Sequence, residues 1–227
     1  MQDLVLSLFC FTVTTVASVA AGESTFASDL ERLLRGARIG VTFDVFTERH
    51  PDAVYSDADK RDVPVHSDTP GPLLITHETD PFLGLSVFAN FGFKEAGLYE
   101  MVVVWTGAPE TTHTRRRRFL SAAIERHGHA YIRETILVHP GTPDEQSVAV
   151  FCWYDADAVS LAFYTPPSPV ALHPKGVFTY AQFTPGDPFL DDIFKKSAPT
   201  DAQRAAAWRK LADLLPVLEA DSRDNEH

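Results

Sequence analysis

The chain has 227 residues, of which 44% are hydrophobic, 22% charged and 11% aromatic. This composition is typical of a folded globular protein and excludes wholesale disorder. With 20 Lys and Arg against 31 Asp and Glu, the formal net charge is -11, which disfavours binding to nucleic acid or to anionic lipid. The length predicts one domain, and two cysteines exclude a disulfide scaffold.

The first residues predict export. The stretch from Leu4 to Ala21 is apolar, lacks Lys and Arg, and ends in small residues that fit a cleavage site. Asp3 stands where a signal peptide usually carries a positive charge, so an uncleaved membrane anchor is the alternative. We expect a periplasmic or secreted protein that meets a membrane only through this segment, if it is not cleaved. The predicted organisation is a signal peptide or anchor over 1–21, one domain over 22–220 and a charged tail over 221–227.

Helix signals follow this segment. Ser28 and Glu31 have the spacing of a capping box, which predicts a helix that begins after Ser28. Thr42 predicts the cap of a second short helix that ends at Pro51. Residues 52–72 are rich in Asp, Pro and Gly and predict a long loop, which is the candidate partner-facing segment. Its candidate contacts to a basic partner are Asp57, Asp59 and Asp62.

The centre of the chain alternates apolar and polar residues and predicts an antiparallel sheet. Residues 98–105 are apolar on both sides, with Met101 and Trp105 on one face and Leu98 on the other. Together these elements predict an α+β fold: an antiparallel sheet of about five to seven strands with helices packed on one face. The predicted strands are 73–78, 86–93, 98–105, 130–139, 148–154, 159–164 and 177–183. The predicted later helices are 115–127 with Gly128 after it, 188–196, and one that a capping box of Thr200 and Gln203 opens.

We find no recognised catalytic motif in the sequence. The chain has no Gly-x-Ser-x-Gly elbow, no P-loop and no dinucleotide-binding fingerprint, and no second histidine follows His77-Glu78 at helical spacing. Asp155 and Asp157 look like paired catalytic carboxylates, but a tight hairpin turn explains them better. We therefore predict a non-catalytic protein without a cofactor.

Histidines and cysteines give weak signals. His127, His129 and His139 form a local cluster, but Gly128 separates the first two, so we predict no metal site. We expect His127 to lie at a helix end, where the dipole favours its cation. Cys152 lies in an apolar run and predicts a buried core residue.

The most conspicuous charge feature is a run of four arginines at the start of a predicted helix. Consecutive helical residues spread around a full turn, so we expect their stems to cover apolar surface rather than to form one flat patch. A phosphate site or an acidic partner is the alternative. The candidate residues are Arg115, Arg116, Arg117 and Arg118. Phenylalanine is also abundant, with 16 residues, which predicts either a filled sheet core or a Phe-lined pocket for a small apolar ligand.

The order of these parts resembles small exported α+β domains of Gram-negative bacteria. The layout over residues 28–165 is similar to β-lactamase-inhibitor-protein-like domains and to the small lipoprotein of the outer-membrane barrel-assembly machine, although the chain lacks a lipobox. The resemblance implies a binding module and carries over no functional residue. The residues that carry it are Ile39-Gly40-Val41-Thr42 before the helix ending at Pro51, Phe91-Gly92-Phe93 with Gly97-Leu98-Tyr99-Glu100 as a hairpin, and the helix ending at Gly128.

These observations lead to a first functional hypothesis and two alternatives. The first is a non-catalytic exported protein that binds another exported protein, for example an acidic inhibitor or immunity protein. The second is a carrier of a small apolar ligand in a Phe-lined pocket. The third is an envelope enzyme whose site has no recognised motif.

Overall fold

The computed structural model of the chain describes residues 26–55, 73–80, 82–108, 113–128, 131–167, 176–196 and 198–212. The predicted export segment over 1–21, most of the predicted loop over 52–72 and the tail over 221–227 lie outside the described residues. No helix in the described part of the chain has the length and apolarity needed to cross a bilayer.

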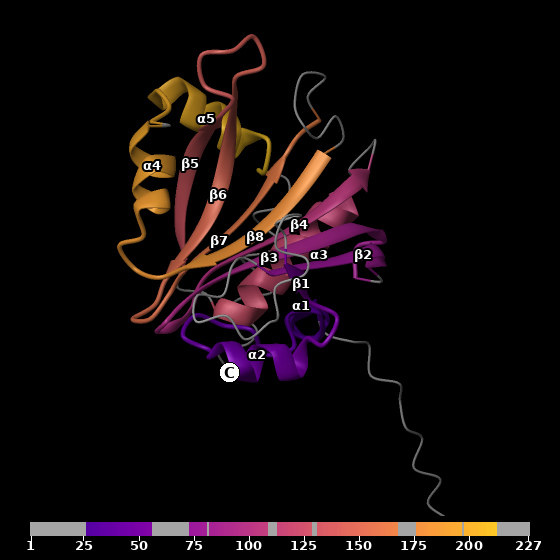
Figure 1. The fold of residues 1–227 in the computed structure, drawn as a ribbon. Coiled ribbons are helices and arrows are strands. Elements are labelled where there is room, and N and C mark those ends of the chain that lie inside the picture. Colours follow the sequence, from indigo (N-terminus) through magenta and orange to yellow (C-terminus); the bar gives the residue numbers. More distant parts are fainter. Residues whose placement is uncertain are drawn as a thin grey trace, which may run out of the picture.

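One strongly twisted antiparallel sheet organises the fold (Figure 1). Its eight strands are β1 (Val54–Tyr55), β2 (Leu73–Asp80), β3 (Leu85–Lys94), β4 (Gly97–Ala108), β5 (Ile132–Val138), β6 (Gln146–Tyr154), β7 (Val159–Thr165) and β8 (Gly176–Phe183). They form two four-stranded meanders in the order β1-β2-β3-β4-β8-β7-β6-β5, so that β4 and β8 pair at the centre. The predicted α+β class and antiparallel sheet are confirmed. The strand count exceeds the predicted five to seven because the two-residue β1 forms inside the segment predicted as a loop.

Helices cover both faces of the sheet, which corrects the prediction of one covered face. Their bounds are α1 (Phe26–Leu34), α2 (Phe43–Arg49), α3 (His113–His127), α4 (Pro188–Lys196) and α5 (Asp201–Arg209). One core, which we call the helix-side core, contains buried residues of α1, α2, α3 and the end of α5. The second core lies on the opposite face, where Leu190 of α4 packs against β5–β8. Alternation along β6 explains both cores, because Phe151 and Trp153 belong to the first while Val150 and Cys152 belong to the second.

Aromatic contacts fill the helix-side core. The Phe119 ring of α3 lies 5.5 Å from Trp105 of β4 and 5.0 Å from Phe178 of β8, measured between ring centroids. Such tilted and edge-on pairs are the favoured arrangements of aromatic rings. Most of the strand phenylalanines are buried, so the filled-core prediction holds for them. Phe163 is an exception, since it is only partly buried and lines a pocket described below.

Local signals place most helix ends correctly. The capping box of Thr200 and Gln203 is confirmed, with both reciprocal hydrogen bonds present. Gly128 follows α3 with a φ of 73°, the left-handed conformation expected of a C′ glycine. The prediction for Ser28 is wrong, because α1 already begins at Phe26 and Ser28 lies inside it.

A register shift moves Leu98 to the helix-side core. The β3–β4 pairing shifts between Gly92 and Phe93, and Leu98 therefore shares a core with Met101 instead of facing away from it. A Cβ atom at Gly92 would come within 2.6 Å of the Glu100 side chain, so a larger residue at this irregularity would displace the side chains of Glu100 and Tyr99.

Candidate functional site

A pocket of about 590 Å³ lies between α3, α5 and the end of the sheet where β6 begins and β7 ends. We call it the α3–α5 pocket. Its volume falls within the range of small-molecule sites, roughly 300–1,000 Å³. It is lined by Arg116, Leu120, Ser147, Val148, Ala149, Phe163, Tyr164, Pro166, Pro167, Phe178, Ala207, Lys210 and Leu211.

The lining is mostly apolar, and its charged groups have one sign. The polar side chains are the hydroxyls of Ser147 and Tyr164 and the two cations Arg116 and Lys210. No Asp or Glu is among the described residues that line it, although acidic residues outnumber basic ones by 31 to 20 in the whole chain. The pocket is therefore an apolar hollow with positive charge in a protein of net negative charge.

Tyr164 builds one wall of the pocket and contacts both an aromatic ring and a cation. Its ring lies 4.9 Å from the ring of Phe178, and the guanidinium of Arg116 lies 5.2 Å from the Tyr164 centroid. A cation at this distance from an aromatic face is attracted by the ring quadrupole. Gly176 makes room for the wall, since a Cβ there would come within 2.2 Å of the Tyr164 hydroxyl and 2.8 Å of its ring.

The structure divides the arginine run between two surroundings. The Arg116 guanidinium lies over the ring of Tyr164, whereas the Arg118 guanidinium lies 5.3 Å from the ring of Phe82. These contacts are made by the guanidinium groups, so the coverage of apolar surface by the arginine stems stays a prediction. Of the four candidates only Arg116 lines the pocket. The Arg115 side chain lies beside Gly84, and Arg117 is exposed. The other candidates Asp57, Asp59 and Asp62 lie outside the described residues.

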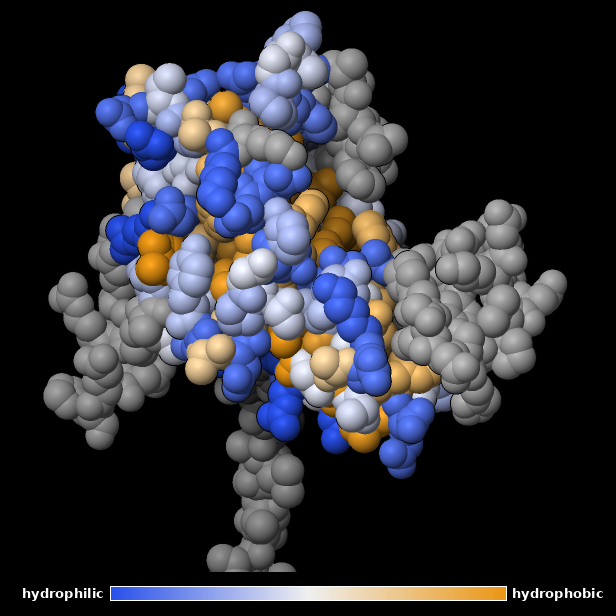
Figure 2. All heavy atoms as spheres, turned by 60° about the vertical axis from the view of Figure 1, so that its left-hand side comes forward, coloured by the Kyte–Doolittle hydropathy of each residue, from blue (hydrophilic) through white to orange (hydrophobic). Residues whose placement is uncertain are grey.

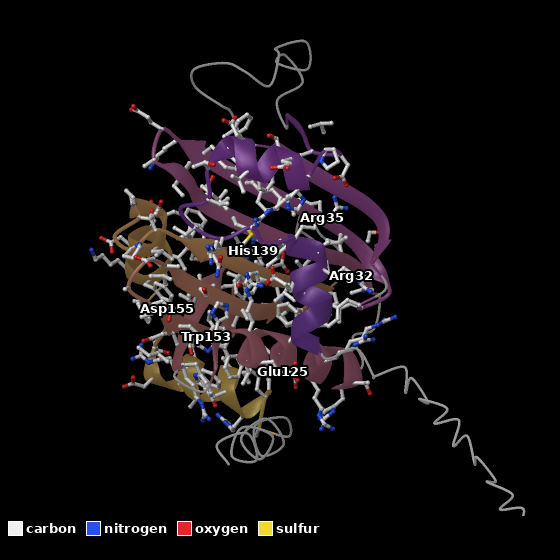
Figure 3. All side chains as sticks on the ribbon, turned by 90° about the horizontal axis from the view of Figure 1, so that it is seen from below. Arg32, Arg35, Glu125, His139, Trp153 and Asp155 are labelled. Carbon is white, nitrogen blue, oxygen red and sulfur yellow. The ribbon has the colours of Figure 1, made fainter. Side chains whose placement is uncertain are left out.

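A second polar cluster lies at the opposite end of the β6–β7 hairpin. The Nε2 atom of His127 is 2.8 Å from the hydroxyl of Tyr180, and its Nδ1 atom is 3.9 Å from Oδ2 of Asp155. The rings of Trp153 and Tyr180 stack on the His127 imidazole at centroid distances of 5.0 and 5.8 Å. Figure 3 labels Trp153, near the turn-side end of β6, and Asp155, just beyond the strand, close to each other. The spatial order of a carboxylate, a histidine and a hydroxyl resembles a nucleophile-activating triad.

Burial prevents this cluster from acting on a substrate through Tyr180. The Tyr180 side chain has no solvent exposure, and burial raises its pKa to about 12. Burial and the nearby Arg126 lower the pKa of His127 to about 4, so the imidazole is neutral at pH 7. The expectation of a protonated His127 favoured by the helix dipole is therefore wrong. The cluster holds the end of α3 against the sheet.

The remaining sequence candidates have structural roles. Asp155 begins the predicted β6–β7 turn, where its N–H donates to the carbonyl of Ala158. Cys152 is fully buried, as predicted, and burial raises its pKa to about 12, so its thiol stays protonated. His129 lies outside the described residues, and within the described ranges no three His, Cys, Asp or Glu side chains gather closely enough to hold a metal ion.

Comparison with known proteins gives no match: no known protein family, no curated protein and no solved structure is significantly similar to this chain. The layout resemblance to inhibitor-like and barrel-assembly domains therefore stays a prediction.

The contact between Tyr164 and Gly176 leads to a prediction for stability. Gly176→Ala should reduce the free energy of unfolding by about 1–3 kcal/mol, because the added methyl displaces the Tyr164 ring. The same substitution in a Tyr164→Ala background should cost almost nothing, since the obstructing ring is gone. Urea unfolding of the four proteins measures this cycle. Equal costs in both backgrounds would show that Tyr164 does not occupy the space above Gly176.

The neutral His127 leads to a prediction for pH dependence. Its pKa is lower in the folded protein than in the unfolded chain, so the unfolded state binds the proton first as the pH falls. Between pH 7.5 and pH 5 the wild type should lose about 2 kcal/mol of stability through this residue. His127→Gln should lose that much less over the same interval.

Urea unfolding at both pH values measures the difference between the two proteins. Burial also lowers the pKa of His50, but His50 is present in both proteins and its contribution cancels. An identical pH dependence of the two proteins would contradict a neutral, buried His127.

Proposed function

We propose that the protein binds a small, largely apolar ligand in the α3–α5 pocket. The observation that supports this best is the pocket itself: about 590 Å³ of space that is lined by apolar and aromatic side chains and already formed without a ligand. This is the carrier hypothesis of the sequence analysis, with the pocket walls now named. Under this proposal, Phe163 and Phe178 are the phenylalanines among the described lining residues that would contact the ligand.

The proposal is a binding function without a reaction. Ser147 is a hydroxyl nucleophile by residue type, but neither a histidine nor a carboxylate is among the described lining residues that would activate it. Burial of the ligand's apolar groups then supplies the affinity, at about 0.8 kcal/mol for each methylene removed from water. With the export predicted from residues 1–21, the ligand would be met in the periplasm or outside the cell.

Filling the pocket should weaken binding of the ligand. Ala207 is buried on α5 and lines the pocket, whereas its neighbour Ala206 is exposed. We expect 1-decanol to bind the wild type with a dissociation constant on the order of micromolar, as judged by isothermal titration calorimetry. Ala207→Phe should weaken this binding at least about tenfold because the ring takes the place of the tail. Ala206→Phe, the matched control, should bind like the wild type.

Thermal melts show whether each variant is folded. Undiminished binding by folded Ala207→Phe would contradict the proposal, and so would the absence of binding to the wild type by 1-decanol and by its charged ten-carbon analogues.

A second candidate function, protein binding, is favoured by an exposed apolar patch on the α4 face of the sheet. We call Ile132, Tyr154 and Phe189 the α4-side patch; their exposed fractions are 49%, 53% and 51%. Ile132 pairs with Cys152, next but one to Tyr154 along β6, and the Phe189 ring lies 5.4 Å from Phe183 on the same face. Figure 2 shows apolar groups, in orange, reaching the surface among polar ones on the side of the molecule that carries α4.

Carboxylates adjoin this patch. Glu134 lies two residues from Ile132 on β5, and the exposed Asp155 and Asp157 follow Tyr154. Exposed aromatic groups with a charged rim are typical of protein interfaces, and negative charge favours a basic partner. This is the first hypothesis of the sequence analysis, moved from the 52–72 loop to a described surface.

Affinity capture tests the second candidate. The chain from Gly22 onward, immobilised and exposed to envelope and secreted fractions, should recover a basic protein in stoichiometric amount. A Tyr154→Ser, Phe189→Ser double variant should lose it, since the contacts to the partner's apolar surface are removed. Val54→Ser, which changes an exposed apolar residue of β1, should retain it. Recovery of the same proteins by all three would contradict a role for the patch.

A further inference from the structure

We propose that the α3–α5 pocket selects amphiphiles whose headgroup is an anion, such as a carboxylate or a phosphate monoester. This inference rests on the proposed function and adds the chemistry of the ligand's head. It follows from the charged groups that line the pocket, which are two cations, Arg116 and Lys210, from two different helices. A mostly apolar pocket whose charged lining residues are both cations matches an apolar tail that carries an anion.

Arg116 is held in place at the pocket. Its guanidinium carbon lies 5.2 Å from the centroid of the Tyr164 ring, and the Tyr164 ring lies 4.9 Å from that of Phe178. The planar fork of a guanidinium matches the paired oxygens of a carboxylate or a phosphate, which a single ammonium group does not. The preorganised side chain loses little freedom when it binds an anion.

The position of Arg116 in its helix adds to the positive potential. Arg116 is the fourth residue of α3, a helix of 15 residues whose first turn contains no Asp or Glu. The positive end of the helix dipole therefore lies beside the same region, without a side-chain carboxylate of that turn to compensate it.

Lys210 supplies a second, adaptable cation. It occupies the C-cap of α5, where its backbone N–H bonds to the carbonyl of Ala206, and its side chain is exposed. The flexible stem lets the ammonium follow headgroups of different size. Arg116 fixes the orientation of the head, and Lys210 adds charge without strict geometry.

The carboxylates of the β6–β7 turn lie at the other end of the hairpin from the α3–α5 pocket. Asp155 and Asp157 occupy the β6–β7 turn, whereas the pocket lies where β6 begins and β7 ends. Among the described lining residues a cationic headgroup would meet two positive side chains and no negative one, which disfavours it.

Three ten-carbon probes with the same tail test the headgroup directly: decanoate, 1-decanol and decyltrimethylammonium. At pH 7.5 and low salt, calorimetry of the full chain should show decanoate binding roughly 5- to 10-fold more tightly than 1-decanol. Decyltrimethylammonium should bind more weakly than both. Raising the salt to 0.5 M should reduce the preference for decanoate, since the ions screen a partly exposed pair. Decyl phosphate, tested in the same way, shows whether a carboxylate or a phosphate head fits better.

Single substitutions then assign the preference to the two cations. Lys210→Met should weaken decanoate several-fold and leave 1-decanol unchanged, because the methionine keeps the apolar stem and removes only the charge. Arg209→Met is the matched control: it changes the net charge equally at the neighbouring position, but Arg209 does not line the pocket. Lys210→Met combined with Arg116→Gln should bind decanoate and 1-decanol equally.

The outcomes separate the inference from the proposed function. Equal affinity of the wild type for decanoate and 1-decanol would overturn the headgroup inference and leave the apolar site intact. A preference for decanoate that survives the double substitution would also overturn it, since groups other than Arg116 and Lys210 would then recognise the headgroup. Binding of no ten-carbon probe at all would overturn both proposals.

Discussion

The packing of Phe119 across the central seam of the sheet determines where the pocket forms. This α3 ring contacts Trp105 on β4 and Phe178 on β8, so one side chain spans the pair of strands that joins the two meanders. With α3 fixed there, Arg116 comes to lie one turn earlier on the helix, over Tyr164. Leu120, next to Phe119, lines the same pocket. The site is therefore a consequence of how one helix docks on the seam.

The sequence predicts the strands and helices better than the site, for a physical reason. Alternation and capping are local signals, and they correctly place β3, β6, α3 and the Thr200 box. The helix over 188–196 was predicted, but its place on the second face was not, because the apolar residues of a short helix do not indicate which face of the sheet they will cover. The sequence also did not predict that Leu98 lies in the helix-side core, because this depends on a register shift that no local sequence pattern indicates.

The pocket itself could be predicted only in part. Arg116 was a candidate because of its charge, but its distinction from Arg115, Arg117 and Arg118 depends on a contact to Tyr164, 48 positions later in the chain. Ala207 and Lys210 gave no signal at all, since they line the site only once α5 packs beside β6. Pro166 and Pro167 follow β7 directly and form part of the wall.

Charge is distributed unevenly over the described surface, and this fits two separate binding surfaces. The apolar pocket with its cations lies at one end of the β6–β7 hairpin, while Asp155, Asp157 and the exposed Tyr154 lie at the other. A small anionic amphiphile and a basic protein would therefore meet different parts of one molecule without competing for the same residues.

A crystal structure of the complex with 10-bromodecanoate tests the central claim most directly, because the bromine gives an anomalous signal that locates the tail. The account predicts a single bromine peak between Phe163 and Ala207, with the carboxylate within hydrogen-bonding distance of Arg116 and Lys210. Bromine elsewhere in the molecule, or an empty pocket at saturating ligand, would contradict it.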